Sequence, residues 1–181
     1  QTDEYVNTTY PLSPLGWAML GGNAGVLYWQ ADDTWPGPSW SQVELGADRY
    51  KVGYYAFQRA FQPVLVAGQL NAGTDQLAIY FSRSDYGVLA SLNATLRLTA
   101  IKWSGGAAGP AFELAVTLPG QHRSAKLFAA SLASVLSSTG CAARNECVLQ
   151  IEVFQAGESV SVASNKVYLS KLNEVTTMVA D

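Results

Sequence analysis

Charge and histidine are scarce in this sequence. Of its 181 residues 14% are charged, the formal net charge is −3, and His122 is the one histidine. A nucleic-acid-binding protein normally presents a basic face, and nothing in this balance suggests one. His122 lies beside Arg123 in a predicted turn, so we expect a surface side chain. Ser39 and Ser41 have no histidine in their part of the chain, which leaves a serine nucleophile unsupported.

Cysteine is almost as rare, since Cys141 and Cys147 are the only two. A zinc site normally needs four ligands, so a pair six residues apart predicts no metal site, and we expect no cofactor. A local disulfide between Cys141 and Cys147 is the favoured interpretation, and two free thiols are the alternative. Two sequons, at Asn7 and Asn93, are weak signals singly. Together with a disulfide they favour the secretory pathway, as a lysosomal, vacuolar or extracellular protein.

Long apolar runs are also missing, and none reaches the length that spans a bilayer. The chain shows no signal peptide and begins with Gln1 rather than Met. We therefore expect a processed or trimmed piece. What is abundant is apolar sequence in short segments, 49% of the chain, which is enough for a sizeable core.

Residues 63–181 carry the pattern of an all-β domain. Short segments with alternating apolar residues are separated by Gly and Pro turn signals. The expected strands are Gln76–Phe81, Ala94–Trp103, Ala111–Leu118, Cys147–Phe154 and Ser159–Leu169. Leu127–Leu136 fits either a strand or a helical turn. Five to eight strands over this length predict an antiparallel sandwich of immunoglobulin type.

Residues 1–62 differ, because they are rich in aromatic and turn residues. Val26–Trp29 predicts a strand buried on both faces, and Asp32–Ser41 contains two prolines and must be a loop. Asp48 is a candidate N-cap for a helix over Arg49–Gln62. Four aromatic residues share one face of that helix: Tyr50, Tyr54, Phe57 and Phe61. One buried strand and one helix cannot form a domain. We therefore expect residues 1–62 to be the end of a larger α/β domain.

A specific motif lies in this first region. It runs through Leu27, Tyr28, Trp29, Gln30, Asp33, Trp35, Pro38, Ser39, Trp40 and Ser41, and then through Phe61, Pro63 and Leu65. The motif resembles the end of the catalytic barrel in β-mannosidases of glycoside hydrolase family 2, in which Gly-x-Leu-Tyr-Trp-Gln-x-Asn-Asp-x-Trp is followed by Pro-Ser-Trp-Ser. Asp32 stands where that pattern has Asn. Weaker likeness continues through Ser84-Asp85, Trp103, the cysteine pair and Asn165–Leu169.

The resemblance implies a fold and a site. Residues 1–62 would end a (β/α)8 barrel, and residues 63–181 would be the immunoglobulin-like accessory domain. Active sites of such barrels lie in the loops after the strands. Trp29 and Trp35 are expected to pack on the apolar face of a sugar, against the alternative of plain core or loop packing. Asp33 would bind a sugar hydroxyl or orient the loop. Trp40 is expected to pack the loop down.

The implied activity is retaining hydrolysis of terminal β-D-mannose by two glutamates, neither of which matches a residue here. Glu44 is expected beyond the loop, and Asp32 is expected to be solvated. The chain would thus hold no catalytic residue and be inactive without the rest of its polypeptide, its expected partner besides the oligosaccharide. No nucleic acid or membrane partner is expected. The rival interpretations are an inactive relative and a non-catalytic sandwich for adhesion or carbohydrate binding.

Overall fold

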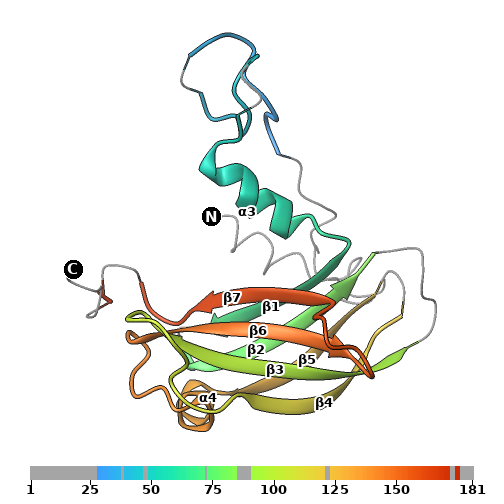
Figure 1. Cartoon of the computed structure of the whole chain (residues 1–181), viewed down its shortest axis with the longest axis vertical. Coiled ribbons are helices and arrows are strands. Elements are labelled where there is room, and N and C mark those ends of the chain that lie inside the picture. Colours follow the sequence, from blue (N-terminus) through green and yellow to red (C-terminus); the bar gives the residue numbers. More distant parts are fainter. Residues whose placement is uncertain are drawn as a thin grey trace. The chain divides into compact units, whose positions relative to one another are not determined.

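The computed structural model of the chain describes residues 28–37, 39–46, 49–71, 73–84, 91–120, 123–171 and 174–175 (Figure 1). The chain divides into two compact units, Gln1–Gln62 and Pro63–Asp181. In the described part of the chain, no helix is long and apolar enough to cross a membrane.

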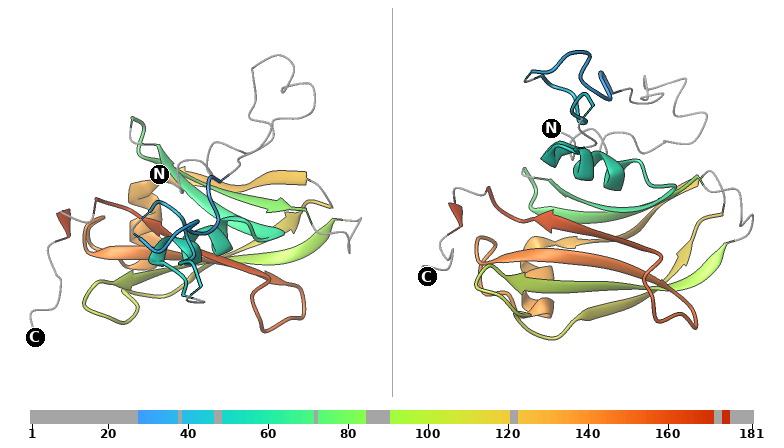
Figure 2. Two further views of the ribbon diagram at one scale, coloured as in Figure 1. Left: turned by 90° about the horizontal axis from the view of Figure 1, so that it is seen from above. Right: turned by 45° about the horizontal axis from the view of Figure 1, so that its top comes forward.

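The second unit is a sandwich of two antiparallel sheets, and Figure 2 shows them face to face. The predicted β-sandwich is therefore confirmed. The strands are β1 (Val64–Asn71), β2 (Gln76–Arg83), β3 (Leu92–Lys102), β4 (Phe112–Leu118), β5 (Arg123–Ser131), β6 (Cys147–Gln155) and β7 (Ala163–Tyr168). Sequence patterning misses β1, whose residues alternate less clearly.

The order of the strands is β1-β2-β5 in one sheet and β4-β3-β6-β7 in the other. In constant-type immunoglobulin domains the fourth strand joins the sheet of the first two strands. Here β4 pairs instead with β3, with Leu96 opposite Leu114. The sandwich architecture thus follows the expectation, while the fourth strand has changed sheets.

The alternation that predicts β3 is also what builds the core. Ala94, Leu96 and Leu98 are buried, and the residues between them face outward, because successive side chains of a strand point to opposite faces. On the outer face, Arg97 makes an ion pair with Glu113 of β4 and lies 4.4 Å from the centre of the Phe154 ring. The inner faces of both sheets supply the core: Val66, Leu77, Ile79, Phe81, Leu96, Leu98, Leu149, Ile151 and Val153 are fully buried.

The two sheets also meet along the seam between β1 and β7. At Gly68 of β1, a Cβ atom would lie 2.3 Å from Val167 Cγ2 and 3.0 Å from Ile151 Cδ1, so only glycine permits this packing. The Asn165 side chain of β7 donates a hydrogen bond of 3.1 Å to the Val66 carbonyl of β1. Side-chain amide and backbone therefore join two strands that belong to different sheets.

The ambiguous segment 127–136 is both strand and helix. β5 continues to Ser131, and α4 (Leu132–Thr139) follows at once. The Ser131 hydroxyl accepts a hydrogen bond from the Ser134 N–H, and Gly140 ends the helix in the left-handed conformation. Leu132 and Val135 face the core, so the apolar residues that suggested a strand continue as one face of a helix.

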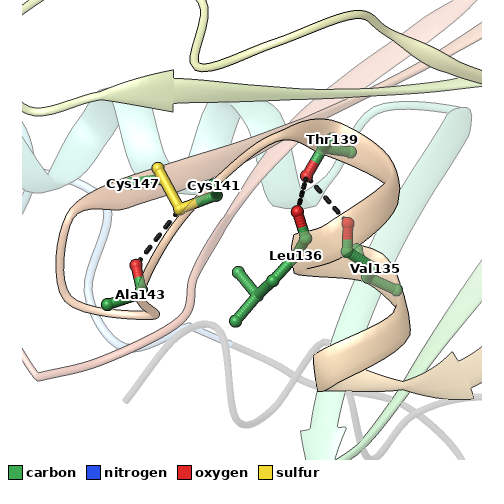
Figure 3. Close-up of a disulfide and its surroundings, with 6 residues drawn as sticks. All are labelled: Val135, Leu136, Thr139, Cys141, Ala143 and Cys147. Atoms are coloured by element: carbon green, nitrogen blue, oxygen red, sulfur yellow. Dashed lines mark hydrogen bonds between the residues drawn. A yellow bond between two sulfur atoms is a disulfide. The ribbon is translucent and has the colours of Figure 1, made fainter.

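Cys141 and Cys147 form a disulfide, which confirms the predicted pairing (Figure 3). The bond connects the segment after α4 to the first residue of β6, and both cysteines are buried beside Ala100. The Thr139 hydroxyl donates to the Val135 carbonyl at 2.8 Å and thereby closes the last turn of α4. The Cys141 sulfur lies 3.1 Å from the Ala143 carbonyl oxygen, a contact without a proton because the sulfur is oxidised.

The first unit contains one described helix, α3 (Val52–Ala60), which is shorter than the predicted 49–62. The helix does not extend before Val52, because the Lys51 N–H donates to the Gln42 carbonyl of the preceding loop at 2.8 Å. Lys51 occupies the N-cap position without a side-chain cap, so the prediction of Asp48 as N-cap is wrong. Asp48 itself lies outside the described residues.

The predicted strand Val26–Trp29 is only partly described, at Tyr28 and Trp29, and neither residue is in a strand. A barrel strand exists only with hydrogen-bonded neighbours on both sides. Among the described residues of this unit, backbone pairing is limited to isolated bridges from Val43 to Asp32 and to Tyr50. The barrel assignment of residues 1–62 stays a prediction.

Candidate functional site

The segment that holds the predicted sugar contacts folds back on itself. The Asp33 N–H donates to the Val43 carbonyl at 2.9 Å, and the Gln42 and Val43 N–H groups both donate to the Ala31 carbonyl at 3.1 Å. We call residues 29–37 and 39–41 the tryptophan loop. Backbone hydrogen bonds thus join its two arms, with Trp35 and Trp40 between the bonded residues and Trp29 just before them.

All three indoles of the tryptophan loop are exposed. Trp29 is 79% exposed, Trp35 60% and Trp40 65%. Burying indole is strongly favourable, so three exposed tryptophans on one short loop are an unusual apolar surface. The sequence predicts that Trp40 packs the loop down, but its ring is exposed. Its backbone carbonyl makes the contacts instead, accepting hydrogen bonds from the Tyr28 hydroxyl and the Gln42 side chain.

Asp33 lies at the centre of the loop and is buried, with 3% of its surface exposed. Its carboxylate accepts hydrogen bonds from the Ser39 and Ser41 hydroxyls. Lys51, the residue before α3, places its ammonium nitrogen 3.2 Å from Asp33 Oδ1 and 3.0 Å from Oδ2. Buried carboxylates need such partners, and here the loop and Lys51 provide them.

The same ammonium group reaches two further acceptors. It lies 3.2 Å from the Ser39 carbonyl oxygen and 3.0 Å from the Ser41 hydroxyl oxygen. Sequence reasoning misses Lys51 entirely, because it sits singly in an aromatic stretch with no motif around it. The available signal is indirect: a buried aspartate in a loop requires a cation, and Lys51 and Arg49 are the nearest candidates along the helix approach.

The hydrogen bonds from Ser39 and Ser41, followed by the charge of Lys51, lower the pKa of Asp33 from 3.8 to about 2, against the opposing effect of burial. The folded pKa is below the unfolded one, so the unfolded loop binds a proton more readily between these values. The contribution of ionised Asp33 to the stability of the folded loop is therefore complete above about pH 4 and is lost as the pH falls through 2.

This linkage gives a prediction for the full chain. The anisotropy of tryptophan fluorescence should fall as the pH falls from 4 to 2, because protonated Asp33 releases the loop and its exposed indoles move more freely. Asp33→Asn should remove that pH-dependent decrease and leave the loop looser at neutral pH. Asp32→Asn is the matched control, since the Asp32 side chain is exposed, and it should keep the wild-type profile. An unchanged profile in Asp33→Asn would contradict the assignment.

Aromatic packing holds the start of the loop to α3. The Tyr28 ring lies 4.1 Å from the Phe57 ring between centroids, and the Gln42 side chain donates to the Tyr28 hydroxyl at 2.6 Å. Tyr50 stacks on Tyr54, and Phe57 stacks on Phe61. Of the four residues predicted for the aromatic face, Tyr54 and Phe57 belong to α3, whereas Tyr50 and Phe61 flank the helix.

The remaining predicted residues take plain structural roles. Glu44 forms an ion pair with Arg49, whose side chain is 72% exposed, and Asp32 is exposed. The Ser39 and Ser41 hydroxyls both donate to the Asp33 carboxylate and hold the loop around it. Asn93 is exposed on β3, whereas Asn7 and His122 lie outside the described residues. In the part of the chain that is described, no three His, Cys, Asp or Glu side chains gather as a metal site.

Known proteins with similar sequences include fungal β-mannosidases. The chain is 38% identical over 65 residues to "Beta-mannosidase A" of Aspergillus oryzae, covering 36% of this chain and 7% of that protein. It is 36% identical over 90 residues to "Beta-mannosidase A" of Aspergillus fumigatus, covering 50% and 9%. The resemblance to β-mannosidases is confirmed. The chain spans less than a tenth of the length of these relatives.

Other comparisons add little. No protein-family model matches the chain. β-Glucuronidase 2 of Bacteroides uniformis superposes with a TM-score of 0.31 and 7% identity, over 60% of this chain and 13% of that one. A TM-score this low supports no argument about the fold. The β-mannosidase likeness therefore rests on sequence, and the sandwich rests on the structure itself.

Proposed function

We propose that this chain is the C-terminal portion of a retaining β-mannosidase that removes terminal β-D-mannose from oligosaccharides or glycoprotein glycans. The observation that carries the proposal is the 36–41% identity to β-mannosidases, and three exposed indoles on one loop support it. Sugars have apolar C–H faces on which indole rings pack. The tryptophan loop is accordingly proposed as one wall of the active site.

Within that wall, Trp29 and Trp35 are proposed to contact the sugar. Asp33 has two possible roles, a hydroxyl contact or loop orientation. Its burial and its bonds to Ser39, Ser41 and Lys51 favour the second role, because a sugar hydroxyl would have to displace those partners. The wall would position the substrate, and its contacts with the sugar would contribute to the free energy of substrate binding.

The chemistry itself would need residues beyond this chain. Retaining hydrolysis uses two carboxyl groups about 5–5.5 Å apart, one as acid/base and one as nucleophile. The described carboxylates of the first unit are otherwise engaged or exposed: Asp33 bonds to Lys51, Glu44 bonds to Arg49, and Asp32 faces solvent. We therefore propose that the catalytic glutamates lie in the rest of the polypeptide and that this chain alone is inactive.

The exposed apolar surface of the first unit favours a further part of the protein that covers it. Among its described residues, the two buried side chains are Asp33 and Ser41, and α3 has no buried residue. Eight of its large apolar side chains are exposed: Trp29, Trp35, Trp40, Leu45, Tyr50, Val52, Tyr55 and Phe61. A unit without an apolar core of its own is marginal, and we propose that the remainder of the barrel covers it.

The disulfide and the exposed Asn93 support a place in the secretory pathway, with Asn7 and Asn93 as proposed glycosylation sites.

The test compares the full-length protein with the 181-residue chain. Full-length protein should hydrolyse an aryl β-mannoside faster than the matching β-galactoside and β-glucuronide. Proton NMR should show β-mannose as the first product. The chain alone should be inactive. Hydrolysis by the chain alone, or a full-length protein that prefers another sugar, would overturn the proposal.

A further inference from the structure

We propose that the ion pair between Lys51 and Asp33 is a positioning device that fastens the tryptophan loop to the start of α3 and thereby sets the place of Trp35. The inference rests on the proposed function for the sugar, but the fastening itself is independent of it. Lys51 is a positioning residue here and does not touch substrate.

The geometry distinguishes this pair from an ordinary surface ion pair. The Lys51 side chain is 24% exposed and that of Asp33 4%, whereas the neighbouring Arg49–Glu44 pair is 72% and 34% exposed. Exposed pairs contribute little, since solvent screens them and both side chains lose freedom. A buried pair is different, because removing one partner leaves a charge without compensation.

The shape of the ammonium group suits the role. Lysine presents three donors on a compact head, and Lys51 distributes them over four oxygens at 3.0–3.2 Å, two on Asp33 and two on Ser39 and Ser41. These acceptors lie on both sides of Trp35 and Pro36 along the chain. One side chain thus fixes the two arms of the turn that carries Trp35, while the indole itself remains exposed.

The site also explains why α3 starts where it does. Lys51 is extended, with its N–H bound to the Gln42 carbonyl, and its side chain returns toward the loop. Any shift of α3 along its axis would break the contacts to Asp33. The start of the helix and the loop conformation are therefore set by the same residue.

The test begins with the loop rather than with activity. Lys51→Met keeps the length of the side chain and removes the charge. In the full-length protein, chymotryptic cleavage after Trp40 should become about tenfold faster, because cleavage follows the population of the opened loop. Arg49→Met is the matched control, two residues away in an exposed pair, and its cleavage rate should equal that of the wild type.

A double variant separates the pair from the single residues. Asp33→Asn/Lys51→Met removes both charges and leaves an amide that still accepts hydrogen bonds from Ser39 and Ser41. Its cleavage rate should lie below that of Lys51→Met, since no charge is left uncompensated. Lys51→Arg restores the charge and should recover most of the protection. Cleavage that is unchanged in Lys51→Met, or equal in the single and double variants, would overturn the fastening.

Kinetics of the full-length protein test the consequence for the sugar. Lys51→Met should raise KM for an aryl β-mannoside about tenfold while kcat changes little, because a displaced platform loses binding common to substrate and transition state. Faster chymotryptic cleavage together with an unchanged KM would overturn the role of the ion pair in placing Trp35. If the wild-type protein does not hydrolyse β-mannosides, the proposed function fails, and the cleavage assay still decides the fastening.

Discussion

Replacing Trp35 with alanine in the full-length protein should lower kcat/KM for a β-mannoside by about 30- to 1000-fold. Trp35 is 60% exposed on a loop whose backbone is internally bonded, so its indole is free to form a platform for a sugar. Losing a well-buried aromatic contact costs about 2–4 kcal/mol. That energy corresponds to the stated change in turnover efficiency. The measurement is hydrolysis corrected for the folded fraction.

Trp35→Phe is the matched variant, because it keeps a flat apolar ring and should lose much less. The loop itself should tolerate both changes, since the Asp33 cluster does not use the Trp35 side chain. Wild-type efficiency in Trp35→Ala would mean that the tryptophan loop does not touch substrate. The assignment of this loop to the active-site wall would then be wrong.

Removing the disulfide should lower the free energy of unfolding of the sandwich by about 2–2.5 kcal/mol. The bond closes a ring of seven residues, and the chain-entropy relation gives this value for such a ring. Cys141→Ala/Cys147→Ala is the suitable variant, because both positions are buried beside Ala100 and alanine leaves no unpaired polar group. Urea unfolding of the 181-residue chain, followed by circular dichroism, measures the change.

Reduced wild-type protein is the control for that experiment, and it should unfold at about the same urea concentration as the double-alanine variant. β-Mannoside hydrolysis by the full-length variant should be retained at temperatures at which it stays folded, since the bond lies in the second unit. Equal stability of the oxidised and reduced proteins would contradict the role given to Cys141 and Cys147.

The sandwich could be predicted because its signals are local. In β3, apolar residues alternate with Asn93, Thr95 and Arg97, and a period of two residues allows no other regular structure with one buried face. The turn residues between strands separate the segments. The pairing of β4 with β3 could not be predicted, because the pattern of a strand says which face is buried and not which neighbour it has.

The candidate site was predictable only in part. The motif points to Trp29, Asp33 and Trp35 as a group, and the structure places them on one loop. Lys51 could not be found this way, because its contact with Asp33 spans 18 residues and depends on the path of the loop. The strand predicted at Val26–Trp29 would need hydrogen-bonded neighbours on both sides, and a local sequence pattern does not identify those neighbours.

The bond from Asn165 to Val66 bears on how the edges of the sandwich are protected from further strands. β1 and β7 are both at the edges of their sheets, where free backbone groups can recruit a strand from another molecule. The Asn165 amide occupies the Val66 carbonyl at 3.1 Å, and Gly68 lets β7 approach so closely that an intruding strand would have to force the seam apart. Two small residues thereby act against intermolecular strand addition along this side of the domain, a protection that neither sheet would have alone.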